Sequence, residues 1–258
     1  MVLSDRVLTL ALERAGLQAP VRFEEVTPST QAMALAMAAE GAPEWTLVGA
    51  GHQTQGRGRL GRTWIDEPGA GLLFSLVLRP TFEPRYAGLL VLLAGWALAG
   101  VTAEASGAPV RCTWPNDLVV GDRKIGGILA ESRLHGSGRF EGVVLGVGLN
   151  VGGAPEQVEA AGAVAIADPA ELLGDFLTRL RSFYEPDLPS RAGELVAAYR
   201  AICATLGLPV RARTTAGVVV EGTATDVDDG GALVVESGGE RTRVAFGEIQ
   251  HLGVQGLE

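Results

Sequence analysis

The stretch from Gln53 to Trp64, QTQGRGRLGRTW, constrains this chain more than any other part of it. Glycines alternate there with arginines, and a tryptophan ends the run. Glycine permits positive φ and a close approach of the backbone to a ligand, while the arginine guanidinium offers planar donors to a carboxylate or phosphate. The stretch therefore predicts a loop that holds anions, although an exposed basic surface loop has the same composition.

The run GRGRLG also matches the G-x-G-x-x-G pattern of dinucleotide-binding folds. In those folds the first glycine directly follows a strand and the last one opens a helix. Here HQTQ separates the apolar segment WTLVGAG from Gly56, and TWIDEPGAG downstream breaks a helix instead of starting one. The context therefore argues against a Rossmann fold.

The composition narrows the class of protein. The chain has 258 residues, of which 47% are hydrophobic, which is enough for one large domain and a small one. A formal net charge of −9 argues against a general nucleic-acid binder, which needs a broad basic face. Cys112 and Cys203 are the only cysteines and lack a metal spacing, so we expect a reduced cytoplasmic protein.

Apolar segments and turn residues predict the order of the elements. A strand and turn over 21–30 precede a helix whose N-cap is Ser29 or Thr30, and GLLFSLVLRP reads as a strand. The segment AGLLVLLAGWALAGVTA, 87–103, is shorter than the ~20 residues that cross a bilayer, so we expect a buried helix and no membrane association. PVRCTWPNDLVV reads as strand–turn–strand, and RKIGGILAESRL and RFEGVVLGVGLNV as antiparallel strands. The fold class is therefore α+β, a mixed, largely antiparallel sheet packed with helices.

The rest of the chain predicts two helices and a small β-domain. The stretch 153–167 has few apolar anchors and predicts a loop that is mobile without ligand, and helices follow over 171–185 and 190–207. Strands with turns at Asp229-Gly230 and Gly238-Gly239 complete a small β-barrel. We expect a short helical segment at 1–20, a main domain at 21–206 and a C-terminal domain at 207–258.

Three further motifs follow the glycine–arginine run in order: WPNDL at 114–118, GDRKIGGILAE at 121–131 and GVGLN at 146–150. Together with Ser29-Thr30, this ordered set resembles the biotin protein ligases, also called biotin–acetyl-CoA-carboxylase ligases, from about residue 21 to the C-terminus. The resemblance implies a class II synthetase-like catalytic domain and an SH3-like C-terminal domain. It also implies a cytoplasmic enzyme that uses ATP, biotin and Mg²⁺ to form biotinoyl-AMP and diphosphate.

The resemblance also implies partners. The activated biotin would pass to a lysine of the biotin carboxyl carrier domain of acetyl-CoA carboxylase, and family members often form homodimers. Some members carry an N-terminal winged helix-turn-helix that represses transcription. About twenty residues cannot hold that domain, so we expect the monofunctional type, which does not bind DNA.

The resemblance also implies which residues form the site, because each family motif has a matching segment in this sequence. Lys124 and Arg59 are the expected catalytic cations, because this reaction needs orientation and charge neutralisation instead of a nucleophilic triad; a solvated turn lysine is the alternative for Lys124. The expected biotin-binding residues are Ser29, Thr30, Gln31, Gln53, Gly56, Arg57, Gly58, Arg59, Lys124, Gly127 and Gly146. The expected ATP-binding residues are Arg59, Arg62, Trp64, Asn116, Asp117, Lys124 and Asn150, with Asp117 as an Mg²⁺ ligand. Trp64 either stacks on adenine or anchors the loop in the core.

One position departs from the family pattern. Many members have a lysine before WPND, whereas this chain has Thr113. Phosphate binding would be weaker unless Arg111, two residues earlier on the same strand face, supplies the charge. A biotin-binding protein with impaired adenylation therefore stays as an alternative. A lipoate-type ligase is a second alternative, because that family has a related fold and also forms an adenylate.

Overall fold

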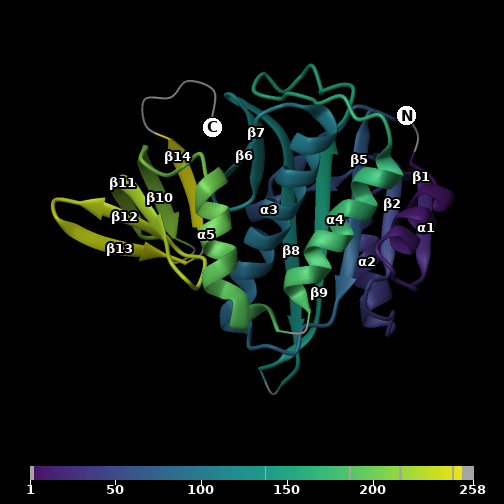
Figure 1. Ribbon diagram of the computed structural model, residues 1–258, viewed down its shortest axis with the longest axis horizontal. Coiled ribbons are helices and arrows are strands. Elements are labelled where there is room, and N and C mark those ends of the chain that lie inside the picture. Colours follow the sequence, from purple (N-terminus) through teal and green to yellow (C-terminus); the bar gives the residue numbers. More distant parts are fainter. Residues whose placement is uncertain (1–2, 137, 186, 215–216, 246, 252–258) are drawn as a thin grey trace.

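The computed structural model describes residues 3–136, 138–185, 187–214, 217–245 and 247–251. Within them, seven strands form a central sheet in the order β1-β2-β5-β9-β8-β7-β6 (Figure 1). These strands are β1 (Val21–Thr27), β2 (Leu47–Gln53), β5 (Gly71–Leu78), β6 (Val110–Thr113), β7 (Asp117–Val120), β8 (Arg123–Leu134) and β9 (Phe140–Asn150). The β1–β2 pair is parallel and the other neighbouring pairs are antiparallel. The predicted α+β class is confirmed, and a parallel dinucleotide-binding sheet is excluded.

Helices cover both faces of this sheet. They are α1 (Asp5–Arg14), α2 (Thr30–Ala39), α3 (Ala87–Ser106), α4 (Pro169–Tyr184) and α5 (Ala192–Ile202). The main core contains buried side chains of α1, α3, α4 and α5, whereas α2 packs with Val48, Val77 and Val144 in a separate small cluster. We call the sheet face that α2 covers the second face; Val77 of β5 and Val144 of β9 lie on it. Ser75 and Gly146 are two residues away along the same strands, so they lie on the second face as well.

Helix α3 is the predicted buried helix. The span Pro84–Ser106 is long and apolar enough to cross a membrane, but most of it is buried inside the protein. Leu89, Leu90 and Leu93 are fully buried, and the helix packs against α4, α5 and β8. It ends at Gly107, whose φ of +70° suits a glycine C-cap.

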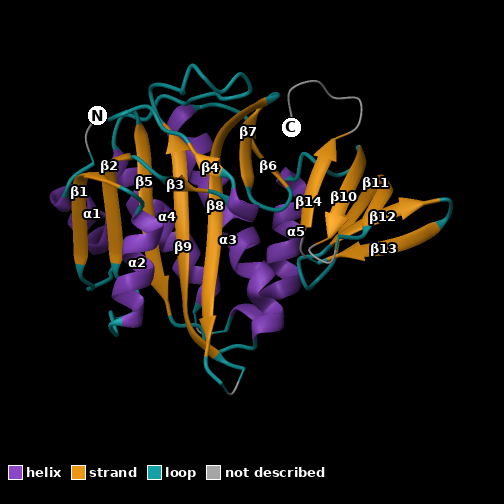
Figure 2. Ribbon diagram, turned by 180° about the vertical axis from the view of Figure 1, so that it is seen from behind, coloured by secondary structure: helices purple, strands orange, loops and turns teal. Residues whose placement is uncertain are grey.

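The C-terminal part forms a second, antiparallel sheet in the order β13-β12-β11-β10-β14. Its strands are β10 (Pro209–Thr214), β11 (Val219–Val227), β12 (Leu233–Ser237), β13 (Glu240–Val244) and β14 (Gly247–His251). Figure 2 shows this sheet beside α5, at one end of the large sheet. Residues 1, 2 and 252–258 of the predicted terminal segments lie outside the described residues.

The helix predicted over 190–207 is too long at its C-terminal end. Helix α5 stops at Ile202, and Cys203 is extended with φ −76° and ψ 109°. Cys203 forms a parallel β-bridge with Cys112, and the amide of Ala204 donates to the carbonyl of Cys112 at 2.7 Å. Pairing with β6 therefore overrides the helical pattern of the sequence.

The expectation of few apolar anchors in the stretch 153–167 is also wrong. Ala161, Val164 and Ile166 are buried. The amide of Lys124 donates to Ala160 at 2.8 Å, and the amide of Val164 donates to Asn150 at 3.1 Å. The stretch is therefore tied to β8 and β9.

Candidate active site

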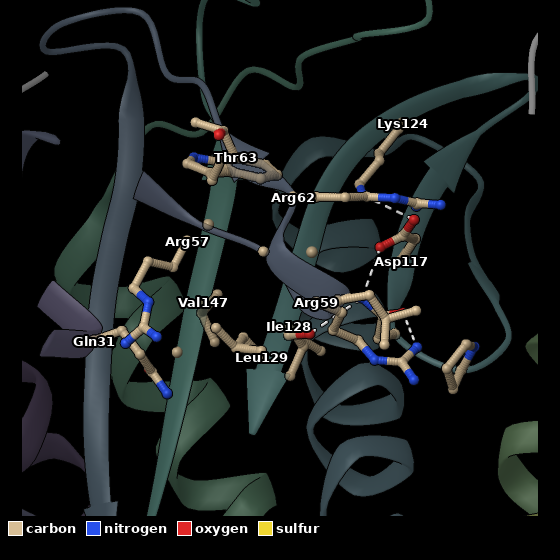
Figure 3. A pocket seen from close by; sticks show the side chains of 18 of the residues that line it. Gln31, Arg57, Arg59, Arg62, Thr63, Asp117, Lys124, Ile128, Leu129 and Val147 are labelled. Atoms are coloured by element: carbon tan, nitrogen blue, oxygen red, sulfur yellow. Dashed lines mark hydrogen bonds and ion pairs between the residues drawn. The ribbon is translucent and has the colours of Figure 1, made fainter. Parts of the chain in front are cut away.

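The glycine–arginine run folds back over the second face of the large sheet as a short hairpin. Strands β3 (Gly56–Arg57) and β4 (Thr63–Trp64) pair, and a 3₁₀ turn (Arg59–Gly61) joins them. A Cβ atom at Gly56 would lie 2.4 Å from the carbonyl oxygen of Trp64, so this position requires glycine. The hairpin aims its arginines at the neighbouring strands (Figure 3).

A pocket of about 170 Å³ lies between the hairpin and the sheet. Most of the site residues predicted from the sequence line it: Thr30, Gln31, Gln53, Arg57, Gly58, Arg59, Arg62, Trp64, Asn116, Asp117, Lys124, Gly127 and Gly146. Ser29, Gly56 and Asn150 are outside this lining. Ser29 caps α2 by accepting from the amide of Ala32, and Asn150 is buried and donates to the carbonyl of Gly162 at 2.9 Å.

One end of the pocket carries a buried hydrogen-bond network. The side-chain oxygen of Gln53 accepts from the amide of Thr30 at 2.8 Å and from its hydroxyl at 3.1 Å. The hydroxyls of Thr30 and Ser75 are 2.9 Å apart, and Ser75 donates to the side-chain oxygen of Gln31 at 3.2 Å. These polar groups are fixed before any ligand binds, which suits a small ligand with its own donors and acceptors.

Sequence reasoning missed two members of this network. Ser75 is the single polar side chain in the apolar run GLLFSLVL, which was the available signal. Asp66 is 4% exposed, accepts from the amide of Gln53 at 3.2 Å, and lies 2.8 Å from a ring nitrogen of His52. Asp66 follows Trp64 by two residues and contacts His52 and Gln53, so it ties the end of the glycine–arginine stretch to its beginning.

Glycines of β9 make room for side chains that line the pocket. A Cβ atom at Gly146 would lie 2.4 Å from the side-chain oxygen of Gln31, and one at Gly148 would lie 2.5 Å from the Trp64 indole. The indole nitrogen of Trp64 is buried and has no hydrogen-bond partner among the described residues. The Trp64 indole therefore packs against Gly148 of β9.

The other end of the pocket is ionic. The ammonium of Lys124 lies 2.8 Å from a carboxylate oxygen of Asp117, whose other oxygen accepts from Asn116 at 2.9 Å. Arg59 donates to the side-chain oxygen of Asn116 at 2.9 Å. Burial lowers the pKa of the Arg59 guanidinium, Asp117 opposes this shift, and Arg62 adds to it. The ordinary pKa of arginine lies so far above 7 that Arg59 stays a cation at pH 7.

Thr113 and Arg111 occupy different surroundings. Thr113 lines the pocket and is 8% exposed, and its hydroxyl has no hydrogen-bond partner in the described part of the chain. Arg111 is outside the lining and donates to the carbonyl of Cys203 at 3.1 Å. Ile249 of β14, which the sequence gave no reason to select, also lines the pocket. The second domain therefore contributes to this wall.

The residues present restrict how a metal ion can bind. The described residues contain no group of three or more His, Cys, Asp or Glu side chains placed to hold a metal ion. Asp117 is the carboxylate in the pocket lining. Magnesium often binds through one or two carboxylates together with substrate phosphates, so Asp117 fits an ion that arrives with a polyphosphate.

The arrangement defines a class of enzyme. A polar slot at one end and cations at the other suit a small carboxylic acid held beside a polyphosphate. The needed chemistry is orientation and charge neutralisation, because a carboxylate is itself a nucleophile. The fold and the site are those of a ligase that activates a carboxylate.

Comparisons with known proteins specify the family. The model of the biotin/lipoate A/B protein ligase family matches residues 23–150, and that of the biotin protein ligase C-terminal domain matches residues 205–252. The biotin–acetyl-CoA-carboxylase ligase of Mycobacterium tuberculosis is 38% identical over 88% of this chain and 86% of its own length. The bifunctional ligase/repressor BirA of Bacillus subtilis is 31% identical over 91% of this chain and 75% of its own.

A solved structure has the same fold. The biotin protein ligase from Aquifex aeolicus in complex with biotin and ATP superimposes with a TM-score of 0.72 at 23% identity, covering 90% of this chain and 99% of that one. This chain belongs to the biotin protein ligase family.

Proposed function

We propose that this protein activates biotin with ATP as biotinoyl-5′-AMP and transfers the biotinoyl group to a lysine of an acceptor protein. The observation that carries this proposal is the pocket itself. Its buried polar slot at Thr30 and Gln53 lies beside an ionic end that contains Arg59 and Lys124. The relative from Mycobacterium tuberculosis is a biotin–acetyl-CoA-carboxylase ligase, and the relative from Aquifex aeolicus forms a complex with biotin and ATP.

In the first step the biotin carboxylate attacks the α-phosphorus of ATP, and diphosphate leaves. The slot lined by Thr30, Gln31 and Gln53 would bind the ureido ring, since amide and hydroxyl groups match its donors and acceptors. Lys124 and Arg59 would then hold the carboxylate against the phosphate and offset the developing negative charge. Asp117 would hold Mg²⁺, which neutralises phosphate charge when bound.

In the second step the acceptor amine attacks the acyl carbon, and AMP leaves. The names of the relatives support the biotin carboxyl carrier domain of acetyl-CoA carboxylase as the acceptor. We also propose a cytoplasmic location, since both cysteines are free and buried. The domain limits 21–206 and 207–258 and the homodimer stay predictions.

The test is mass spectrometry of the products formed from biotin, ATP and Mg²⁺, with lipoate in a parallel reaction. Biotinoyl-AMP and diphosphate are the expected products. A lipoyl product alone would move the protein to the lipoate ligases.

A second candidate function is biotin binding with impaired adenylation, which Thr113 in the pocket wall favours, because it supplies no cation where many family members have a lysine. Tight biotin binding without any adenylate would support that candidate and contradict the ligase.

A further inference from the structure

Asp66 carries a buried carboxylate just outside the active-site pocket. Its side chain is fully buried, although both of its sequence neighbours, Ile65 and Glu67, are exposed. Asp66 is not part of the described pocket lining, and the two-step reaction described above gives it no role. A carboxylate is costly to bury unless hydrogen bonds replace its hydration. Its partners therefore indicate what it does there.

Both carboxylate oxygens of Asp66 contact the end of β2. One accepts from the amide of Gln53 at 3.2 Å, and the other lies 2.8 Å from Nδ1 of His52. Because an ionised carboxylate can only accept, the His52 ring donates through Nδ1. The His52 side chain is 29% exposed, whereas Gln53 is buried. The carboxylate is therefore held between a residue at the surface and a residue of the pocket wall.

The way β2 ends explains why a side chain is needed at this point. Strand β2 continues to Gln53, but it pairs with β5 only as far as Ala50. Beyond Ala50 the segment around Asp66 takes the place of β5, since the amide of Gly69 donates to the carbonyl of Gly51 at 3.1 Å and Asp66 accepts from Gln53. A buried backbone N–H needs a partner. For Gln53 that partner is a carboxylate instead of a strand.

Gln53 is thereby fixed through both its backbone and its side chain. Asp66 holds the backbone amide, and the side-chain oxygen of Gln53 accepts from the amide and the hydroxyl of Thr30. No described residue accepts from the side-chain nitrogen of Gln53, which lines the pocket. This nitrogen is left to donate to a ligand, and a carbonyl oxygen is the group that it fits.

We propose that Asp66 is a positioning residue for the cyclic urea of biotin and that it acts through Gln53. This inference rests on the proposed ligase function. Asp66 does not touch the pocket, but it fixes the backbone from which the Gln53 amide reaches the ligand. Small displacements of a positioned group are costly to binding and catalysis. Loss of the carboxylate should therefore weaken biotin binding specifically.

The test measures the Kd for biotin by isothermal titration calorimetry without ATP. Asp66→Ala removes the acceptor and should raise this Kd about tenfold or more, the scale of leaving a buried donor unpaired. Asp66→Asn keeps an oxygen acceptor for the Gln53 amide and should restore a Kd close to that of the unaltered protein. The KM for ATP at saturating biotin should stay unchanged in both variants, because the hairpin keeps its own pairing of Gly56 with Trp64.

Glu44→Ala is the matched control for stability. Glu44 is another carboxylate that accepts from a backbone amide, that of Arg79 at 2.7 Å, and it is outside the pocket lining. Its loss should lower the urea midpoint without changing the Kd for biotin. Asp66→Ser, whose hydroxyl is shorter than the carboxylate, is a milder variant for the case that Asp66→Ala does not fold, and it should also raise the Kd.

Three results would overturn the inference. The first is an unchanged Kd in folded Asp66→Ala or Asp66→Ser. The second is an equal rise in Glu44→Ala, which would make the effect a general loss of stability. The third is a Kd in Asp66→Asn as weak as in Asp66→Ala, because the oxygen acceptor would then not be what positions Gln53. Biotin binding without adenylate in the unaltered protein is a different failure, since it contradicts the proposed function while the Kd comparison needs no ATP.

Discussion

Replacement of Lys124 by alanine should separate catalysis from stability. The Lys124 ammonium and the Asp117 carboxylate are 2.8 Å apart, but their side chains are 39% and 27% exposed. Solvent screens such a pair, so its loss should change the free energy of unfolding by about 0–1 kcal/mol. Loss of one preorganised cation at a site of developing charge costs about 2.7–4 kcal/mol of transition-state stabilisation, or about 10²–10³ in kcat.

The assay is diphosphate release with saturating biotin and ATP, together with urea unfolding of the same samples. Arg123→Ala is the matched control. Arg123 is the neighbouring cation, but it donates to the carbonyl of Ala161 at 3.2 Å and is outside the pocket lining. We expect Lys124→Ala to lose orders of magnitude in rate with little change in urea midpoint, and Arg123→Ala to keep a rate near that of the unaltered protein.

Two outcomes would refute this reasoning. A rate near that of the unaltered protein in Lys124→Ala would remove the lysine from the mechanism. An equal loss of rate in Lys124→Ala and Arg123→Ala would mean that the turn between β7 and β8, not the ammonium at the pocket, is what matters.

Three further predictions follow from particular contacts. Thr113→Lys places a cation in the pocket wall and should lower the KM for ATP; an unchanged KM would contradict a weakened phosphate site. Gly148→Ala puts a Cβ atom 2.5 Å from the Trp64 indole, which should cost about 1–3 kcal/mol of stability by overpacking, measured by urea unfolding, and shift the tryptophan fluorescence. Burial raises the pKa of the Cys112 and Cys203 thiols, so they should resist iodoacetamide at pH 8 in the folded protein. Unfolded thiols ionise from about pH 8.5 while the folded ones keep their protons, so the free energy of unfolding should fall as pH rises above that value.

The sequence predicted the parts of the site that depend on local pattern. The glycine–arginine run, WPNDL and GDRKIGG are recognisable as an ordered set, and the structure brings Arg59, Asn116 and Lys124 to one pocket as expected. Element order was equally predictable, because turn residues and apolar runs alternate clearly along the chain. The roles of these residues toward biotin and ATP stay predictions.

What the sequence could not predict depends on contacts between distant segments. Helix α5 ends early because Cys203 pairs with Cys112 across 91 positions of the chain. Asp66 reads as an ordinary turn residue, yet it accepts from the amide of Gln53. Ile249 lines the pocket together with residues more than a hundred positions earlier in the chain, and the second domain is held there by the bond from the Trp114 indole to the carbonyl of Gly231. None of these has a local pattern that distinguishes it.

Contacts between distant segments also explain how Asn116 and Asp117 are positioned. Trp114, just before them, is 2% exposed, its amide donates to the hydroxyl of Thr205, and its indole nitrogen donates to the carbonyl of Gly231, both at 3.0 Å. On the other side the amide of Ile128 donates to the carbonyl of Asn116 at 2.9 Å. Thr205 after α5, Gly231 of the second domain and Ile128 of β8 therefore fix this turn from three directions. Since a ligand site is only as precise as the groups that support it, the C-terminal domain is part of the ionic end of this pocket even though it supplies few of its side chains.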